Sequence, residues 1–83
     1  MKKAVRKEVL YSNLLKKLPP LVTRQKAEEL LGISQRTLRN LDYQGRGPKP
    51  AFVLGRKVAY PAEELARWFV WEYLPRYNPN LKD

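Results

Sequence analysis

The side chains best suited to do chemistry in this chain are hydrogen-bonding groups that follow Ser34. Arg39 and Asn40 stand three and four positions after Arg36, so a helix places all three on one side as neighbours. Arginine and asparagine can each form two parallel hydrogen bonds with a flat polar partner, which suits them to recognition. Histidine and cysteine are absent, which removes the commonest general base and the usual metal ligands. We therefore expect a binding protein that is not an enzyme and needs no cofactor or metal.

The charge distribution indicates what such a protein binds. The 83 residues carry 17 Lys and Arg against 8 Asp and Glu, a formal net charge of +9. Residues 1–18 hold six basic and one acidic side chain, residues 19–60 eight and three, and residues 61–83 three and four. A positive excess over the first two thirds of so small a chain predicts a polyanionic partner. A basic surface that serves only solubility is the alternative.

The length of the chain suits one small domain. No apolar run approaches the ~20 residues that a membrane span needs, and Met1–Arg6 leads into no continuous apolar region. We therefore expect no membrane association and a cytoplasmic location.

The N-terminal segment has its own pattern. Apolar residues recur at helical spacing between basic ones, which predicts an amphipathic helix over residues 4–18: Val5, Val9, Leu10, Leu14, Leu15 and Leu18. Pro19-Pro20 ends it, so residues 1–20 form a basic helix and a linker. The helix can pack on the rest of the domain or on a second copy, or it can become ordered only on binding.

Two short helices follow, separated by a tight turn. Thr23 is a suitable N-cap for a helix over residues 24–31 whose apolar stripe is Ala27, Leu30 and Leu31, and Gly32 suits its end. Lys26 stands where a capping box would have Glu or Gln. Ser34 is a second N-cap, for a helix over residues 35–43 with Leu38 and Leu41 pointing inward and Ile33 filling the corner. Two helices joined by a short glycine-containing turn are typical of a helix-turn-helix.

A hairpin and a closing helix complete the domain. Residues 45–50 are rich in glycine and proline, and strands over 51–54 and 57–60 flank Gly55-Arg56, which suits a type II′ turn. Pro61 is expected at the first position of a last helix that buries Leu65, Trp68, Phe69 and Tyr73 and ends at Leu74-Pro75. We expect Phe52 and Tyr60 in the core as well, and residues 75–83 as a flexible tail. Trp71, which we consider together with Tyr77, either covers the N-terminal helix or belongs to a self-association surface.

The order of these parts predicts a mainly α fold with a small β-hairpin. Residues 21–74 then form a winged helix-turn-helix domain, preceded by the amphipathic N-terminal helix. In such a domain the second helix enters the major groove of DNA, and the hairpin wing lies on the neighbouring backbone or minor groove.

The stretch Leu21–Phe69 resembles the excisionase/AlpA-like helix-turn-helix family of phages and mobile elements, which is related to the MerR winged-helix domains. The resemblance covers about 49 of the 83 residues and is carried by Leu21-Val22-Thr23, Ala27-Glu28-Glu29-Leu30-Leu31-Gly32-Ile33-Ser34, Thr37-Leu38, Gly45-x-Gly47-Pro48, Gly55-Arg56 with Val58 and Tyr60, and Leu65 with Trp68-Phe69. It departs from the family at Lys26, where an acidic residue is usual, and it does not extend to the first 20 residues or beyond Leu74.

This resemblance implies two related functions in the bacterial cytoplasm or nucleoid. Excisionases bind and bend DNA at attachment sites and set the direction of an integrase, whereas AlpA-like proteins are small activators or repressors of transcription. Residues 34–43 would be the recognition helix and Arg56 the wing residue at the DNA backbone. An integrase or recombinase would then be a partner, and several copies would associate on repeated sites.

The candidate DNA contacts fall into three groups. On the second helix they are Gln35, Arg36, Thr37, Arg39, Asn40 and Tyr43; on the wing, Arg56 and Lys57; at phosphates, Thr23, Arg24, Lys26 and Lys49. Two of them have structural alternatives, since Thr37 can support the Ser34 cap and the Tyr43 ring can pack near the glycine loop. The rival functions are a winged-helix adaptor that binds protein, for example in phage packaging or assembly, and, with less support, RNA binding.

Overall fold

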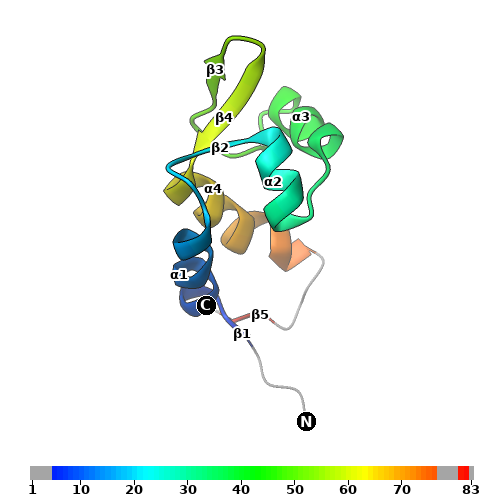
Figure 1. Cartoon of the computed structure of the whole chain (residues 1–83). Coiled ribbons are helices and arrows are strands. Elements are labelled where there is room, and N and C mark those ends of the chain that lie inside the picture. The colour runs from blue at the N-terminus through cyan, green and yellow to red at the C-terminus, as the bar shows by residue number, and fades with distance from the viewer. Residues whose placement is uncertain (1–4, 77–80, 83) are drawn as a thin grey trace.

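Helices and a small antiparallel sheet make up the chain in a computed structural model, which describes residues 5–76, 81 and 82 (Figure 1). The helical elements are α1 (Lys7–Lys17), α2 (Arg24–Leu31), α3 (Gln35–Tyr43), α4 (Ala62–Trp68), a π-helix η1 (Phe69–Tyr73) and a 3-10 helix η2 (Leu74–Arg76). The strands are β1 (Val5–Arg6), β2 (Leu21–Thr23), β3 (Phe52–Leu54), β4 (Lys57–Pro61) and β5 (Leu81–Lys82). The protein is therefore mainly helical, with a three-stranded sheet in the order β2-β4-β3.

Helices α2 and α3 begin at the two predicted caps. The Thr23 hydroxyl accepts a hydrogen bond from the Lys26 amide at 3.1 Å, and the Ser34 hydroxyl accepts one from the Thr37 amide at 3.1 Å. Gly32 ends α2 with a φ of 78°, and Ile33 fills the corner between the helices with 2% of its surface exposed. Local capping chemistry therefore sets both helix starts and the turn between them.

The hairpin is confirmed with its two-residue turn. Leu54 pairs with Lys57, and Gly55 between them has a φ of 65°. In the described chain, residues other than glycine all have a negative φ, and these include Arg56. A positive φ at the first turn residue alone is the type II′ pattern, and it favours glycine there. Pro61 is the last residue of β4 and the N-cap of α4, so the helix begins at Ala62, one position later than predicted.

Strand β2 was not predicted, although it joins the start of α2 to the sheet. Val22 pairs with Tyr60 in an antiparallel ladder and is fully buried. Three residues are too few to show an alternating pattern. Their strand conformation depends on pairing with β4, which lies far along the chain.

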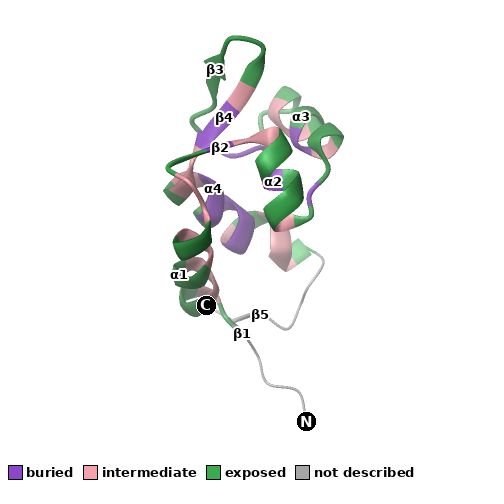
Figure 2. Ribbon diagram, viewed as in Figure 1, coloured by how far each residue is buried: buried purple, intermediate pink, exposed green. Residues whose placement is uncertain are grey.

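The core lies where α2, α3, α4 and the sheet meet (Figure 2). Its fully buried side chains include Val22, Leu38, Tyr60 and Leu65, and Trp68 and Phe69 are nearly so. Three expectations of apolar burial were wrong, because Val9, Leu30 and Phe52 are exposed. For Val9 the reason is that α1 contacts the domain along one stripe, made of Leu10, Tyr11, Leu14 and Leu18, and Val9 lies outside it.

Helix α1 packs on the domain, which decides among the three possibilities left open by the sequence. It begins at Lys7, after β1, and its Leu10, Leu14 and Leu18 pack against the core. The Tyr11 ring meets the Trp71 ring edge-on at 5.7 Å between centroids. Trp71 therefore covers the N-terminal helix.

The end of the chain differs from the expected flexible tail. The last helix changes to a π-helix at Phe69 and to a 3-10 helix over Leu74–Arg76, so it continues past the predicted end at Leu74-Pro75. Leu81–Lys82 pairs in parallel with Val5–Arg6. Tyr77 lies outside the described residues. Among the residues that are described, no helix combines the length and the apolar character that crossing a membrane requires.

Candidate functional site

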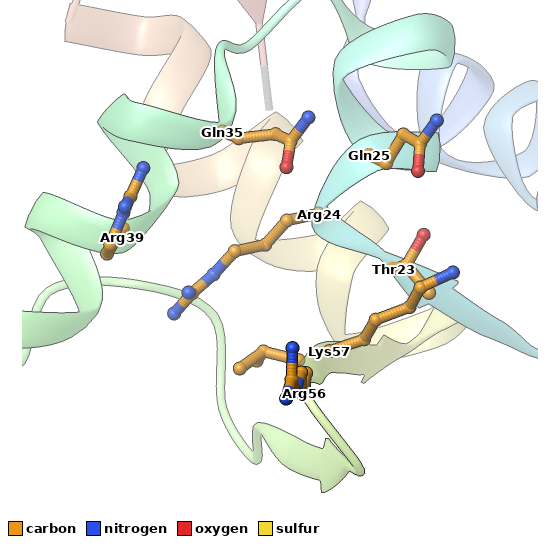
Figure 3. A pocket seen from close by; sticks show the side chains of 8 residues that line it. Thr23, Arg24, Gln25, Gln35, Arg39, Arg56 and Lys57 are labelled. Carbon is orange, nitrogen blue, oxygen red and sulfur yellow. The ribbon is translucent and has the colours of Figure 1, made fainter.

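A groove of about 270 Å³ separates α3 from the β3–β4 hairpin (Figure 3). Three chain segments contribute to it: the junction of β2 and α2, the first half of α3, and the hairpin. The lining residues are Thr23, Arg24, Gln25, Gln35, Arg39, Arg56, Lys57 and Val58. Of the twelve residues predicted to bind DNA, the structure therefore brings six together at one groove.

Three of these residues are cations that have no ion-pair partner among the described residues. Arg39 comes from α3, and Arg56 and Lys57 come from the hairpin turn and the first residue of β4. All three are exposed, and none forms a salt bridge with any other residue of 5–76. Like charges converging without a counter-ion favour an anionic ligand between them.

The fourth cation at the groove, Arg24, is bound within the protein. Its Nη2 donates to Asp42 Oδ2 at 2.7 Å and its Nε donates to Tyr60 Oη at 3.0 Å, while Tyr60 Oη donates to Asp42 Oδ2 at 2.5 Å. The charged side chains of Arg24 and Asp42 are mostly buried, with 21% and 19% of their surfaces exposed. This network joins the first residue of α2, the last turn of α3 and β4. The predicted phosphate contact at Arg24 is therefore a structural cross-link that holds α3 beside the hairpin.

The surroundings of the network shift two pKa values. Burial and the hydrogen bond to Asp42 raise the pKa of Tyr60 to about 12. Burial opposes the charge on Arg24, but the hydrogen bonds to Asp42 and Tyr60 outweigh it, so its pKa is raised as well. Both groups keep their protons at neutral pH, and the network stays complete.

Gly47 lies against this network from the loop after α3. A Cβ at Gly47 would overlap the Asp42 carboxylate and approach the Asp42 backbone nitrogen at 3.2 Å. Only glycine leaves room for the carboxylate at this close approach. The glycine of the Gly45-x-Gly47-Pro48 segment therefore helps to position Asp42.

Apart from the apolar Val58, the remaining groove residues are polar and uncharged. Gln35 Nε2 donates to Glu28 Oε1 at 3.0 Å, which ties the start of α3 to α2. Thr23 is occupied as the cap of α2, and Gln25 is exposed beside it. These residues border the cations without adding charge.

The outer face of α3 carries three more of the predicted contacts. Arg36, Asn40 and Tyr43 are all exposed, and the Tyr43 side chain reaches 94% exposure. The alternative in which the Tyr43 ring packs near the glycine loop is thereby excluded. Together with Gln35 and Arg39, these side chains form a polar surface along the free side of α3, which we call the α3 face.

The last three predicted contacts lie away from both the groove and the α3 face. Thr37 accepts a hydrogen bond from the Ser34 hydroxyl at 2.9 Å and lines a different pocket, with Trp68 and Tyr73. Lys26 pairs with Glu29 at 3.4 Å on the exposed side of α2. Lys49 lines a third pocket, near Glu64 and Glu72. The structure therefore favours the supporting role for Thr37 and separates both lysines from the α3 face and hairpin tip.

Sequence reasoning missed Asp42, Tyr60 and Gln25 as parts of the site. A signal for Asp42 was present, because it is the only acidic residue between Glu29 and Glu63. A lone carboxylate within a basic stretch is a candidate for pairing with one of those bases. Within the described residues, no three His, Cys, Asp or Glu side chains gather in a way that could hold a metal ion.

Comparison with known proteins assigns neither a family nor a function to this chain. No family model matches the sequence, and no curated protein is similar to it.

Proposed function

We propose that this protein binds double-stranded DNA as a winged helix-turn-helix, with α3 in the major groove and the β3–β4 hairpin as the wing. The observation that carries the proposal is the convergence of Arg39, Arg56 and Lys57 on one groove, where residues 5–76 supply no counter-ion to them. A phosphate backbone supplies a row of negative charges that matches such a groove.

The dimensions of α3 suit this role. A helix with its side chains is about 10–12 Å across, and the major groove of B-DNA is about 12 Å wide. With α3 in that groove, Arg36 and Asn40 on the α3 face point at base edges. Arginine pairs with guanine and asparagine with adenine through two hydrogen bonds each.

The groove between α3 and the hairpin then receives the sugar-phosphate backbone that separates the major from the minor groove. Arg39 approaches this backbone from one side and Arg56 and Lys57 from the other. The first turn of α2 has free amide groups beside Thr23 and Gln25, and these add partial positive charge. The Arg24–Asp42–Tyr60 network keeps the two sides at a constant separation.

The resemblance to the excisionase/AlpA-like family narrows the biological role to two. The protein acts either as an excisionase-type directionality factor for an integrase or as a small transcriptional regulator of a phage or mobile element. One module of this size buries too little surface for high affinity alone, so several copies occupy adjacent sites.

Selection from a pool of random duplexes, followed by charge reversal, tests the proposal. We expect the selection to enrich one sequence motif, and we expect the variant Arg36→Glu, Arg39→Glu, Arg56→Glu to lose binding to it. The matched control reverses three cations of the N-terminal segment, Arg6→Glu, Lys16→Glu and Lys17→Glu. A pool without enrichment, or equal loss in both triple variants, would contradict sequence-specific binding by this surface and favour the protein adaptor.

A further inference from the structure

Strand β3 forms a free edge of the sheet, and its side chains are apolar and exposed. Within the described residues β3 pairs with β4 alone. Phe52, Val53 and Leu54 expose 44%, 75% and 48% of their surfaces. Sheets usually protect such an edge with a charged residue, a proline or a bulge, or by keeping the edge strand very short. β3 has only three residues, but no charged residue, proline or bulge stands between Phe52 and Leu54, so this short edge is open to another strand.

The hairpin register determines which backbone groups are available. Because the turn has two residues, Leu54 and Lys57 are the pair next to it, and such a pair is hydrogen-bonded. Pairs alternate along an antiparallel ladder, so the N–H and C=O groups of Val53 point away from β4. Val53 is also the most exposed side chain of the strand. Its backbone and side chain are both free for a partner.

The charge around β3 restricts what that partner can be. In the sequence, Lys49 precedes the strand, Arg56 and Lys57 follow it, and no acidic residue occurs from Tyr43 to Ala62. In the fold, Glu64 and Glu72 share a pocket with Lys49, but neither forms a salt bridge with it within residues 5–76. A second copy paired in the antiparallel direction would bring the cations at one end of β3 near those at the other end of its partner. A strand with acidic residues at both ends would meet them with the opposite charge.

We propose that β3 binds an extended segment of another protein, in which apolar residues alternate and Asp or Glu residues flank both ends. The segment adds to the sheet as a strand beside β3, through hydrogen bonds to the Val53 backbone, and its acidic ends pair with Lys49 on one side and Arg56 and Lys57 on the other. This inference goes beyond DNA binding and does not rest on it.

The test is an NMR titration of the full chain, labelled with ¹⁵N. The added ligand is a synthetic peptide, acetyl-Asp-Glu-Val-Thr-Val-Glu-Asp-amide. We expect chemical-shift changes at residues 51–54 and cross-strand contacts between the peptide and Val53. Val53→Pro removes the outward N–H without removing a hydrogen bond to β4, so it should weaken binding about tenfold. The matched control Val53→Thr keeps that N–H and a branched side chain, and should bind within about threefold of the native chain.

Two further peptides keep the test valid if Val53→Pro disturbs the hairpin. The first replaces the central Thr of the peptide by Pro, and the second replaces its four acidic residues by Lys; both should bind the native chain at least about tenfold more weakly. The proposal is overturned if the proline peptide or a folded Val53→Pro chain binds as tightly as its parent. Changes confined to Arg56 and Lys57, no binding at all, or dimerisation of the chain through β3 would overturn it as well.

Discussion

At the scale of single residues, the Asp42 carboxylate links three elements through one oxygen atom. Arg24 and Tyr60 both donate to its Oδ2, from α2 and from β4. Hydrogen bonds to a charged acceptor contribute about 1.5–3 kcal/mol each in partly buried surroundings. The relative placement of α3 and the hairpin thus depends on side chains that pair with one another within the protein.

The raised pKa of Tyr60 predicts a dependence of stability on alkaline pH. Its pKa is about 12 in the folded protein, whereas a tyrosine exposed in the unfolded chain has its ordinary pKa of about 10. The folded state therefore keeps a proton that the unfolded state loses, so the free energy of unfolding falls as pH rises from about 10 to about 12. Urea denaturation at a series of pH values gives the free energy of unfolding of the native chain and of Tyr60→Phe. The difference between the two free energies measures the contribution of the Tyr60 proton.

The comparison with Tyr60→Phe separates this effect from the titration of other groups. We expect the native chain to lose more stability than the variant between about pH 9 and pH 11.5, because only the native chain has the Tyr60 proton. Parallel pH profiles of the two proteins would mean that the Tyr60 hydroxyl is not held in the network.

Replacing Arg39 tests the groove at the level of one cation. Arg39→Ala removes a proposed phosphate contact, so it should weaken binding to the selected duplex by about 1.5–3 kcal/mol. It should leave the unfolding free energy nearly unchanged, because Arg39 has no salt-bridge partner within residues 5–76. Fluorescence anisotropy with a labelled duplex measures the affinity. Lys17→Ala removes the same charge from α1 and should have little effect; an equal loss in both variants would show that net charge alone governs binding.

The arginines of the site show what sequence reasoning can reach at this scale. Exposure of Arg36 and Arg39 followed from helical spacing, since Leu38 and Leu41 had to face the core. The role of Arg24 did not follow, because its partners Asp42 and Tyr60 lie 18 and 36 positions away. Pairing across such separations depends on tertiary structure that no local pattern records.

At the scale of elements, the helix α1 is fixed by aromatic contacts. Tyr11 meets the Trp71 ring edge-on, and the Arg67 guanidinium lies 5.7 Å from the centre of the Tyr11 ring. Together with Leu10, Leu14 and Leu18, which pack against the core, these contacts hold on the domain a helix that has no fully buried residue.

Removing the Tyr11 ring should detach α1. We expect Tyr11→Ala to lower the free energy of unfolding by about 1–3 kcal/mol and to shift tryptophan emission to longer wavelength as Trp71 meets water. The exposed neighbour Asn13→Ala is the control. If emission and stability match those of the control, the helix is held by other contacts, and the aromatic explanation fails.

Element boundaries were predictable where the signal is local. Thr23, Ser34 and Gly55 set the starts of two helices and the hairpin turn through their own backbone and side-chain chemistry. The strand β2 and the parallel pair β1–β5 were missed because each exists only through a distant partner. The exposure of Phe52 was missed for a related reason, since alternation along β3 does not reveal that nothing covers it.

At the scale of the whole molecule, the positive charge is divided between two ends. The hairpin tip and α3 lie toward one end, and α1 lies toward the other (Figure 1). The basic residues Lys16 and Lys17 belong to the last turn of α1. The winged helix-turn-helix proposal uses only the first of these. The net charge of the chain therefore overstates the number of cations that one stretch of duplex can contact.

The salt dependence of duplex binding tests the central claim most directly. For the native chain, the logarithm of the association constant should fall linearly with the logarithm of salt concentration. The variant Arg39→Ala, Arg56→Ala, Lys57→Ala should reduce the magnitude of that slope by about three, one for each lost phosphate contact, whereas Lys16→Ala, Lys17→Ala should leave it unchanged. A nearly flat dependence for the native chain, or a slope that responds to the α1 variant as strongly as to the groove variant, would contradict the account.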